Sequence, residues 1–475
     1  MVRVAKDHGY THGHTPVSVI ASVNAARIEL LQVSLVTAHG SRPDSLKMKT
    51  ISVAFVVCLL FLHQCEVDAK IWALLVAGSN GWYNYRHQAD ICHAYQILHK
   101  HGVPDENIVV MMYDDLAENY ENPTKGIIIN QPNGPDVYKG VPKDYTGHDV
   151  TPANFLNILK GNKEAMSGIG SGKVIESGPD DYVFVNFADH GAPGLIAFPN
   201  GELHAGKLHD AILYMNETKK YKQMVFYIEA CESGSMFDQT LPHNIKVFAT
   251  TASDARHSSY ACYWDKKRQT YLGDVYSVQW MQDSDKEDLT VETLQEQYEI
   301  VRKKTNTSHV MEFGDMTMKD EVVGLFQGGK KSNVSAGAPP KPITDAVPSP
   351  DVPLMILYKS LELAKTKVEY RQIQAKIAME ESTRSLIRVA SKSIVGKLIP
   401  EETKRLEILS SPAKILDRRC YEEAVKYYKK HCFDFSKYEH ALRHIYVLSN
   451  LCDHGVHIDQ LKKTVKHVCQ VMKIQ

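Results

Sequence analysis

Two short segments of the chain end in side chains that could perform thiol chemistry. Val183–Phe187 is an apolar run that leads to His190 and Gly191, and Val225–Ile228 is a second run that leads to Cys231. Apolar runs of this length, rich in β-branched and aromatic residues, are typical of buried parallel strands. In open α/β sheets the ligand site lies beyond the carboxyl ends of the strands. If the two strands are neighbours, a histidine and a cysteine meet at one edge of the sheet, which is the minimum equipment for nucleophilic catalysis by a thiol.

Each of these residues has a simpler explanation when it is taken alone. A lone cysteine after an apolar run is usually a small buried hydrophobic residue, and a lone histidine at a strand end is usually a structural hydrogen-bonding group. The joint placement favours catalysis, because the N–H groups of Gly191 and Cys231 could hold an oxyanion. Strand alternation places Glu229, two residues before Cys231, on the side of the nucleophile. Asp189, which precedes His190, should point to the opposite face.

Length and charge set the outline of the molecule. A chain of 475 residues is too long for one core and predicts two domains with accessory segments. Residues 351–475 carry 23 Lys+Arg and 15 Asp+Glu, so that part holds +8 and the remainder −9 of the net charge of −1. This difference indicates either an intramolecular electrostatic partner or a solvated helical surface. The sequence shows no basic stripe with aromatic residues, no zinc-spaced Cys/His set and no phosphate-binding glycine loop. It therefore gives no support to a nucleic-acid, metal or nucleotide site.

Residues 48–69 have the pattern of a secretory signal peptide. Lys47 and Lys49 flank Met48, the apolar run Ile51–Leu62 follows, and the stretch ends at the small residue Ala69. Because such a signal starts a protein, Met48 is a candidate initiator, and residues 1–47 are an extension whose translation stays open. A signal anchor is the alternative. In a secretory context the sequons predict N-glycosylation at three positions: Asn216, Asn306 and Asn333.

The order of the remaining patterns predicts an α/β domain followed by an all-α domain. Strands are expected at 72–77, 107–113 and 246–251, and helices at 90–101, 151–159, 204–215 and 289–304, which argues for βαβ units and a parallel sheet. Long loops are expected at 122–147 and from Ser258 to Asp274. A Pro-rich linker at 333–353 separates a domain at 70–332 from a helical domain at 354–475. Four cysteines in the latter predict two disulfides with three possible pairings: Cys420, Cys432, Cys452 and Cys469.

Four motifs in this order closely resemble the legumain family of asparaginyl endopeptidases: Gly78–His93 (GSNGWYNYRHQADICH), Ala188–Gly191, Glu229–Gly234 and Ser258–Tyr260. The similarity extends from about Ile71 to the C-terminus. It implies a caspase-like α/β catalytic domain with a parallel sheet flanked by helices, and an all-α C-terminal prodomain made as part of a zymogen. It also implies the disulfide pairs Cys420–Cys452 and Cys432–Cys469.

The resemblance assigns roles to individual residues. It implies that Cys231 is the nucleophile, that His190 is the general base and acid, that Asn84 orients His190, and that the N–H groups of Gly191 and Cys231 form the oxyanion hole. The implied specificity pocket consists of Arg86, His87, Glu229, Asp274, Ser258 and Ser259. An asparagine side chain suits it, because a guanidinium can donate to the amide oxygen and carboxylates can accept from the NH₂ group. Without the resemblance, Arg86 and Asp274 could be a surface ion pair. Asp189 matches an aspartate that can form a succinimide and is implicated in peptide joining.

The function implied is a cysteine endopeptidase that cleaves after Asn, and after Asp at acidic pH. Its substrates would be proteins and peptides, its prodomain an intramolecular inhibitor released by acid, and cystatin-type proteins further inhibitors. Peptide ligase activity would be secondary. We expect no cofactor, no metal, no nucleic acid, no stable membrane anchor, and a location in the secretory pathway, either lysosomal or endosomal or secreted, including the gut lumen. Asn333 and Asp351 are candidate processing sites. A GPI-transamidase-like subunit and an inactive homologue are the alternatives.

Overall fold

The computed structural model describes residues 69–474, except for residues 239, 331–341 and 411. The predicted extension at 1–47, the predicted signal up to residue 68 and the sequon at Asn333 therefore lie outside the described residues. The other two sequon asparagines, Asn216 and Asn306, are exposed. Within the described ranges no helix is both long enough and apolar enough to cross a membrane.

A six-stranded sheet carries the two segments that could perform thiol chemistry. Its order is β11-β8-β7-β3-β1-β2, with bounds β1 Ile71–Ala77, β2 Ile108–Met111, β3 Tyr182–Ala188, β7 Gln223–Glu229, β8 Val247–Thr251 and β11 Met311–Gly314. Strands β3 and β7 are parallel neighbours, and their register ends on the pair Ala188 and Glu229. The neighbouring strands that the sequence analysis required are therefore present. The sheet is mixed and not purely parallel, because the edge strand β11 runs antiparallel to β8.

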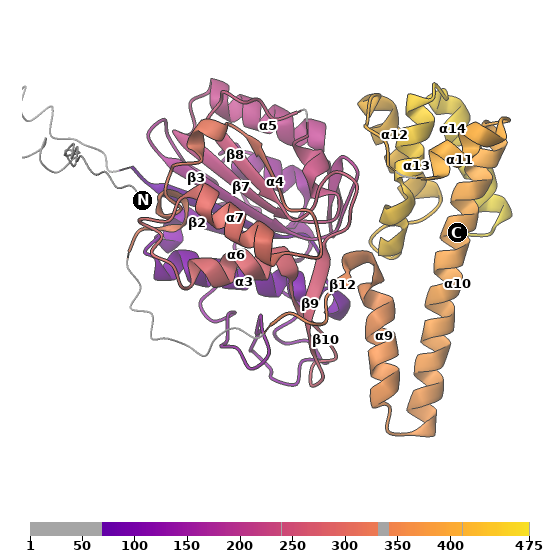
Figure 1. The fold of residues 1–475 in the computed structure, drawn as a ribbon, viewed down its shortest axis with the longest axis horizontal. Coiled ribbons are helices and arrows are strands. Elements are labelled where there is room, and N and C mark those ends of the chain that lie inside the picture. Colours follow the sequence, from indigo (N-terminus) through magenta and orange to yellow (C-terminus); the bar gives the residue numbers. More distant parts are fainter. Residues whose placement is uncertain (1–68, 239, 331–341, 411, 475) are drawn as a thin grey trace, which may run out of the picture. The chain divides into compact units, whose positions relative to one another are not determined.

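Helices cover both faces of this sheet (Figure 1). One face packs against α3 (Tyr85–Lys100), α6 (Val275–Ser284) and α7 (Leu294–Lys304), and the other against α4 (Pro152–Leu159) and α5 (Ala205–Glu217). Every residue of β3 and β7 is buried, which explains why both read as continuous apolar runs. Helix α3 begins five residues before the predicted start, so that Arg86 and His87 lie in its first turn and not in a loop.

The segment predicted as a polar loop up to Asp274 is a β-hairpin. Strands β9 (Tyr260–Asp265) and β10 (Thr270–Asp274) pair antiparallel, and Gln269 in the turn between them has a φ of 51°. The prediction was wrong because the charged turn residues and the serines before them dominate the local composition, and the buried residues of β9 are three in succession, Ala261–Tyr263, without the alternation that marks a half-buried strand. A second three-stranded sheet, β4 (Gly191–Ala192), β5 (Leu195–Phe198) and β6 (Gly201–His204), follows His190 directly.

Part of the predicted Pro-rich linker is ordered. Val347–Pro348 forms β12, which pairs antiparallel with β9, and Ser349–Asp351 forms the 3-10 turn η6. The prediction of a linker did not include this strand. Proline is compatible with an edge strand, because its missing N–H can lie on the side that has no partner strand. The strand continues directly into the first C-terminal helix, α9 (Val352–Leu363).

The C-terminal part is all helical, as predicted. After α9 it contains α10 (Lys367–Leu398), α11 (Glu402–Ser410), α12 (Arg418–His431), the 3-10 turn η7 (Glu439–His444), α13 (Tyr446–Asp453) and α14 (Ile458–Val471). The disulfides Cys420–Cys452 and Cys432–Cys469 join α12 to α13 and the end of α12 to α14. Of the three pairings that spacing left open, the structure contains the one that the resemblance implies.

Candidate active site

His190 lies just beyond the end of β3, where an amide from the neighbouring helix holds it. Its Nε2 atom is 2.9 Å from Oδ1 of Asn84, which caps the N-terminus of α3. The amide oxygen can only accept, so Nε2 carries the proton and Nδ1 is the nitrogen left for base chemistry. The same Asn84 donates its Nδ2 to the backbone oxygen of Asn80. The structure thus places Asn84 in contact with His190, and its role in orienting this histidine stays a prediction.

Cys231 lies two residues past the end of β7 and is buried. Its Sγ atom is 3.7 Å from the hydroxyl of Ser259. Gly191 packs so tightly on this turn that a Cβ atom at its position would lie 2.2 Å from the carbonyl oxygen of Cys231. Only glycine fits there, and this close approach keeps the backbone after His190 against the nucleophile's turn. No hydrogen bond joins His190 to Cys231 in the described part of the chain, as is common before a substrate tightens a catalytic site.

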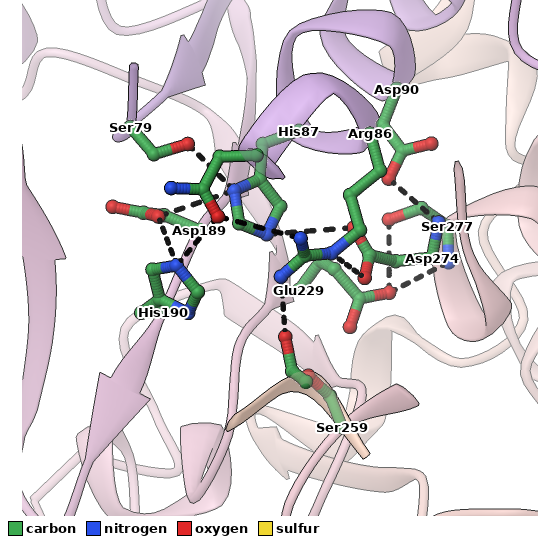
Figure 2. A network of polar contacts seen from close by, with 12 residues as sticks. Ser79, Arg86, His87, Asp90, Asp189, His190, Glu229, Ser259, Asp274 and Ser277 are labelled. Carbon is green, nitrogen blue, oxygen red and sulfur yellow. Dashed lines mark hydrogen bonds and ion pairs between the residues drawn. The ribbon is translucent and has the colours of Figure 1, made fainter. Parts of the chain in front are cut away.

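Arg86 lies in a buried network of polar side chains that includes most residues of the implied specificity pocket (Figure 2). Its side chain is fully buried, its Nε donates to Oδ1 of Asp274 at 2.9 Å, and one Nη donates to the backbone oxygen of Tyr83 at 3.1 Å. Glu229 accepts hydrogen bonds from the N–H and the hydroxyl of Ser277 at 2.9 and 3.1 Å. Because the Arg86–Asp274 pair is completely buried, it is not the surface ion pair that was the simpler alternative.

Three atoms in this pocket are buried and lack a hydrogen-bond partner: Nε2 of His87, Oδ2 of Asp274 and Oε1 of Glu229. Two of them, on His87 and Asp274, lie 3.6 Å apart. Buried polar atoms without partners are costly, so a set of them beside a charged donor indicates a place for a polar ligand. A primary amide, which offers one acceptor and two donors, could satisfy them together with Arg86.

The pocket holds more carboxyl groups than its one guanidinium can balance. Burial and the charge of Asp274 raise the pKa of Glu229 well above its usual range. Burial together with Asp274 and Glu229 does the same to the pKa of Asp90, which the sequence analysis did not single out. Burial also raises the pKa of Asp274, although Arg86 opposes this. Burial, with the charges of Arg86 and His190 adding to it, lowers the pKa of His87 well below its usual range, so this imidazole is neutral at pH 7.

Asp189 does not lie where the sequence analysis expected it. Its Oδ1 is 3.3 Å from Nδ1 of His87 and 3.9 Å from Nε2 of His190, so it faces the site and not the opposite side of the sheet. The strand ends at Ala188, and the alternation of side chains therefore stops before Asp189. Burial raises the pKa of this carboxyl to about 7, although His190 opposes the shift.

The ordered part of the predicted linker contacts residues of the pocket. Beyond β12, the N–H of Ser349 donates to the backbone oxygen of Ser259 at 2.9 Å, and Nη2 of Arg86 donates to the hydroxyl of Ser349 at 2.7 Å. Ser349 is buried. The hydroxyl of Ser349 therefore accepts the hydrogen bond that Arg86 could otherwise donate to a ligand. Nothing in the local sequence marks this serine, because its role depends on the pairing of β12 with β9.

A carboxylate from the C-terminal helical part contacts both His190 and Asn84, the residue that hydrogen-bonds to this histidine. Glu439, at the start of η7, accepts a hydrogen bond from Nδ2 of Asn84, and its other oxygen is 3.2 Å from Nε2 of His190. Although burial opposes both shifts, this contact raises the pKa of His190 and lowers that of Glu439. The sequence analysis missed Glu439, which lies 355 residues from Asn84 along the chain.

Burial keeps Cys231 in its unreactive form. It raises the pKa of the thiol to about 12, with the charge of Glu232 adding to the effect and hydrogen bonds from Ser259 and Ser258 opposing it. Since the thiolate is the nucleophile, the site as it stands is equipped for thiol chemistry but blocked.

Comparisons with known proteins agree with both parts of the chain. The model of the peptidase C13 family matches residues 71–329, and the model of the legumain prodomain matches residues 371–469. Legumain of Homo sapiens is 52% identical over 423 residues, which cover 88% of this chain and 97% of that protein. The vacuolar-processing enzyme delta-isozyme of Arabidopsis thaliana is 40% identical over 424 residues, 84% of this chain and 90% of the other. Among solved structures, caspase-1 from Spodoptera frugiperda matches with a TM-score of 0.34 and 10% identity over 56% of this chain and 93% of that one.

Proposed function

The chain belongs to the peptidase C13 family, and from this premise we propose that the pocket beside Cys231 receives the asparagine side chain of a peptide cleaved after that residue. The protein is a cysteine-type asparaginyl endopeptidase made as a zymogen. What we propose is which residues perform each step and how the zymogen is held closed.

The observation that carries the proposal is the buried donor and acceptor set of the pocket. Arg86 would donate to the amide oxygen of the substrate, and Oδ2 of Asp274 and Oε1 of Glu229, both now without partners, would accept from its NH₂ group. An apolar side chain would leave these atoms unpaired, and sites of this kind reject such substrates by about 10⁴-fold or more. A protonated aspartate resembles asparagine in shape and in its donors, so cleavage after Asp is expected at acidic pH alone.

The chemistry follows from the positions of two side chains. Nδ1 of His190 would take the proton of the Cys231 thiol as sulfur attacks the carbonyl carbon, and the N–H groups of Gly191 and Cys231 would hold the oxyanion. The imidazolium would then protonate the leaving amine. Water would hydrolyse the thioester with His190 as the base, and an amine in place of water would give the secondary ligase reaction. A role for Asp189 in that joining stays a prediction.

Cleavage of matched peptides tests this proposal. The peptides carry Asn, Asp, Gln or Ala before the scissile bond and are offered to the processed enzyme at pH 5.5 and 7.5. We expect turnover of the Asn peptide at pH 5.5, weaker turnover of the Asp peptide that rises with acidity, and almost none of the Ala peptide. Equal turnover of the Asn and Ala peptides would refute the assignment of the pocket. A transamidase-like role is disfavoured because the chain carries the matched prodomain.

We further propose that Ser349 and Glu439 close the zymogen at two points, one in the specificity pocket and one at the catalytic histidine. The segment between β12 and α9 also binds the helical part through Asp351, which contacts Arg384 at 2.8 Å and Arg443 at 3.3 Å. An ion pair between the basic part of the chain and the acidic part is the one that Lys429 forms with Glu202 at 2.7 Å. Asp351, one of the two candidate processing sites, is held in an ion-pair cluster while the zymogen is closed.

The carboxylate of Glu439 should hold the zymogen closed at neutral pH. In Glu439→Gln the charge of the contact with His190 is lost, while the shape of the side chain is kept. A hydrogen bond to a charged group contributes about 1.5 to 3 kcal/mol, so the open form should become about 10- to 100-fold more populated. The measurement is the rate at which iodoacetamide alkylates Cys231 in the unprocessed protein at pH 7.5. The control is Glu401→Gln, because Glu401 is an exposed carboxylate that pairs with Lys404. An unchanged alkylation rate in Glu439→Gln would contradict the proposal that Glu439 holds the zymogen closed.

Two partly buried histidines of η7 should promote opening in acid. Burial and nearby arginines lower the pKa of His440 and of His444 to about 4. The charged groups that face them come from η6, α10 and η7: Asp351, Glu381, Arg384, Arg388 and Arg443. The closed form therefore binds fewer protons than the open form, and its stability falls as the pH drops from about 6.5 toward 4, by about 1 kcal/mol per histidine at pH 5.5.

Replacing both histidines tests this source of acid sensitivity. Glu232 works in the opposite direction, because burial raises its pKa to about 8 although Arg443 opposes the shift, so the closed form gains a proton there as the pH falls. In the double variant His440→Gln and His444→Gln, opening at pH 5.5 should be about 30-fold less favourable, because about 2 kcal/mol of acid-driven destabilisation is removed. The readout is the pH at which Cys231 becomes open to alkylation. That midpoint should move to lower pH, and an unmoved midpoint would mean that other groups drive the release.

A further inference from the structure

A second cluster of chemically active side chains lies outside the catalytic site. Asp254 follows β8, His257 lies three residues further on, and His309 precedes β11. Nδ1 of His257 is 2.7 Å and Nδ1 of His309 is 2.9 Å from the same oxygen, Oδ2 of Asp254. The two imidazole rings are 4.5 Å apart at their centroids. Within the described residues, the only other comparable group is His87, Asp189 and His190, which belongs to the active site.

The fold holds these three side chains together from two separate segments. The other oxygen of Asp254, Oδ1, accepts the N–H groups of Arg256 and His257 at 2.8 and 2.9 Å, which fixes the carboxylate. Nδ1 of His257 lies 2.8 Å from this oxygen as well, so it faces both oxygens of the carboxylate. Next to His309, the hydroxyl of Ser308 donates to the backbone oxygen of Ala252 at 2.6 Å, and β11 pairs with β8. Backbone contacts therefore position both histidines, although their side chains are 56% and 63% exposed.

The two histidines hydrogen-bond to Asp254, and the same three side chains could also hold a cation. Two Nδ1 atoms converge on one carboxylate oxygen, and all three candidate ligand atoms lie within 4.8 Å of one another. Two imidazoles and a carboxylate form a donor set that zinc and related first-row ions prefer, with a fourth position open to water. A metal at about 2.0 to 2.2 Å from each donor would require the atoms to spread by a few tenths of an ångström, which exposed side chains can do.

We propose that Asp254, His257 and His309 form a binding site for a divalent first-row transition ion of the zinc type. Local spacing could not reveal it, because His309 lies 55 residues from Asp254. The proposal does not depend on the proposed function, since none of these three residues belongs to the catalytic dyad or to the specificity pocket.

The site would fix one wall of the active site. The backbone oxygen of His257 accepts the N–H of Glu232, the residue after the nucleophile, at 2.9 Å, and the N–H of Gly234 donates to the backbone oxygen of Ser253 at 3.0 Å. The same loop continues into Ser258 and Ser259. An ion that joins His309 to this loop would therefore stabilise the turn that carries Cys231, without contacting the substrate.

A zinc titration of the full chain tests the proposal. Cys231→Ala serves as the parent, so that zinc cannot bind the nucleophilic thiol. Isothermal titration calorimetry at pH 7.5 is expected to detect one equivalent of zinc, bound at least about tenfold more weakly in His257→Gln and in His309→Gln. His99→Gln is the matched control, because His99 is an exposed histidine beside a single carboxylate, Asp105, at 2.8 Å. The thermal unfolding midpoint of the parent should rise with added zinc, and this rise should be lost in both variants.

The two readouts separate the possible results. The parent and His99→Gln should bind alike, while the two cluster variants keep their metal-free unfolding midpoints and lose zinc. If His257→Gln and His309→Gln bind zinc as the parent does, or if the parent binds none, the site does not exist.

Discussion

Replacing Cys231 by alanine in the processed enzyme will lower kcat for an asparagine peptide by about 10⁶-fold, the loss typical of removing a nucleophile from a hydrolase. The expectation rests on the position of the thiol, which lies two residues past the end of β7. It is beside the backbone of Gly191, and its sulfur is 3.7 Å from the Ser259 hydroxyl. No other described free thiol has this setting. Steady-state kinetics on the processed variant measure the loss.

Cys92→Ala is the matched control for this experiment. Cys92 is also a buried free thiol whose pKa burial raises to about 12, but it lies in α3 with its sulfur 3.8 Å from that of Met112. Its replacement should leave kcat within a few-fold of the parent. A loss below tenfold in Cys231→Ala, with the control active, would mean that another group is the nucleophile.

The second large effect concerns Arg86. In Arg86→Met the pocket loses its charged donor, and kcat/KM for asparagine peptides should fall by about 10³-fold or more, as expected when a site built for hydrogen bonding can no longer satisfy its ligand. Cleavage after alanine should change much less, so the Asn-to-Ala ratio collapses. Asp274 would be left as a buried carboxylate without its partner, which costs about 3 to 5 kcal/mol of stability.

A milder variant keeps this test independent of folding. Arg86→Lys retains the charge but not the planar fork, and we expect about 10- to 100-fold loss of kcat/KM for the asparagine peptide. Arg268→Met is the control, because Arg268 is also buried and donates to Thr124 outside the pocket. An unchanged Asn-to-Ala ratio in folded Arg86→Lys and Arg86→Met would show that the specificity lies elsewhere.

The sequence predicted the parts of the fold and of the site that local pattern controls. Continuous apolar runs marked β3 and β7, and His190 and Cys231 each stand three positions after the last residue of their run. Their register could not be read from the sequence, but once the strands are neighbours the two side chains must share an edge. The contrast with Asp189 is instructive, because alternation was applied one residue past the end of the strand, where backbone geometry changes.

What the sequence did not predict depends on contacts between distant segments. Ser349 and Glu439 have no local signature, since one acts through the pairing of β12 with β9 and the other through the packing of η7 against the catalytic residues. Asp90 was missed for a different reason. Its importance comes from the buried charge balance with Asp274 and Glu229, which only the folded structure defines.

The most direct test of the central claim is labelling by two peptidyl electrophiles that differ only in Asn or Ala next to the reactive group. Each is offered to the unprocessed protein at pH 7.5 and to the processed enzyme at pH 5.5, and mass spectrometry locates the adduct. The account predicts one adduct, on Cys231, formed by the Asn probe and only after the prodomain is released. An adduct on another residue, equal labelling by the Ala probe, or equally fast labelling of the unprocessed protein would contradict it.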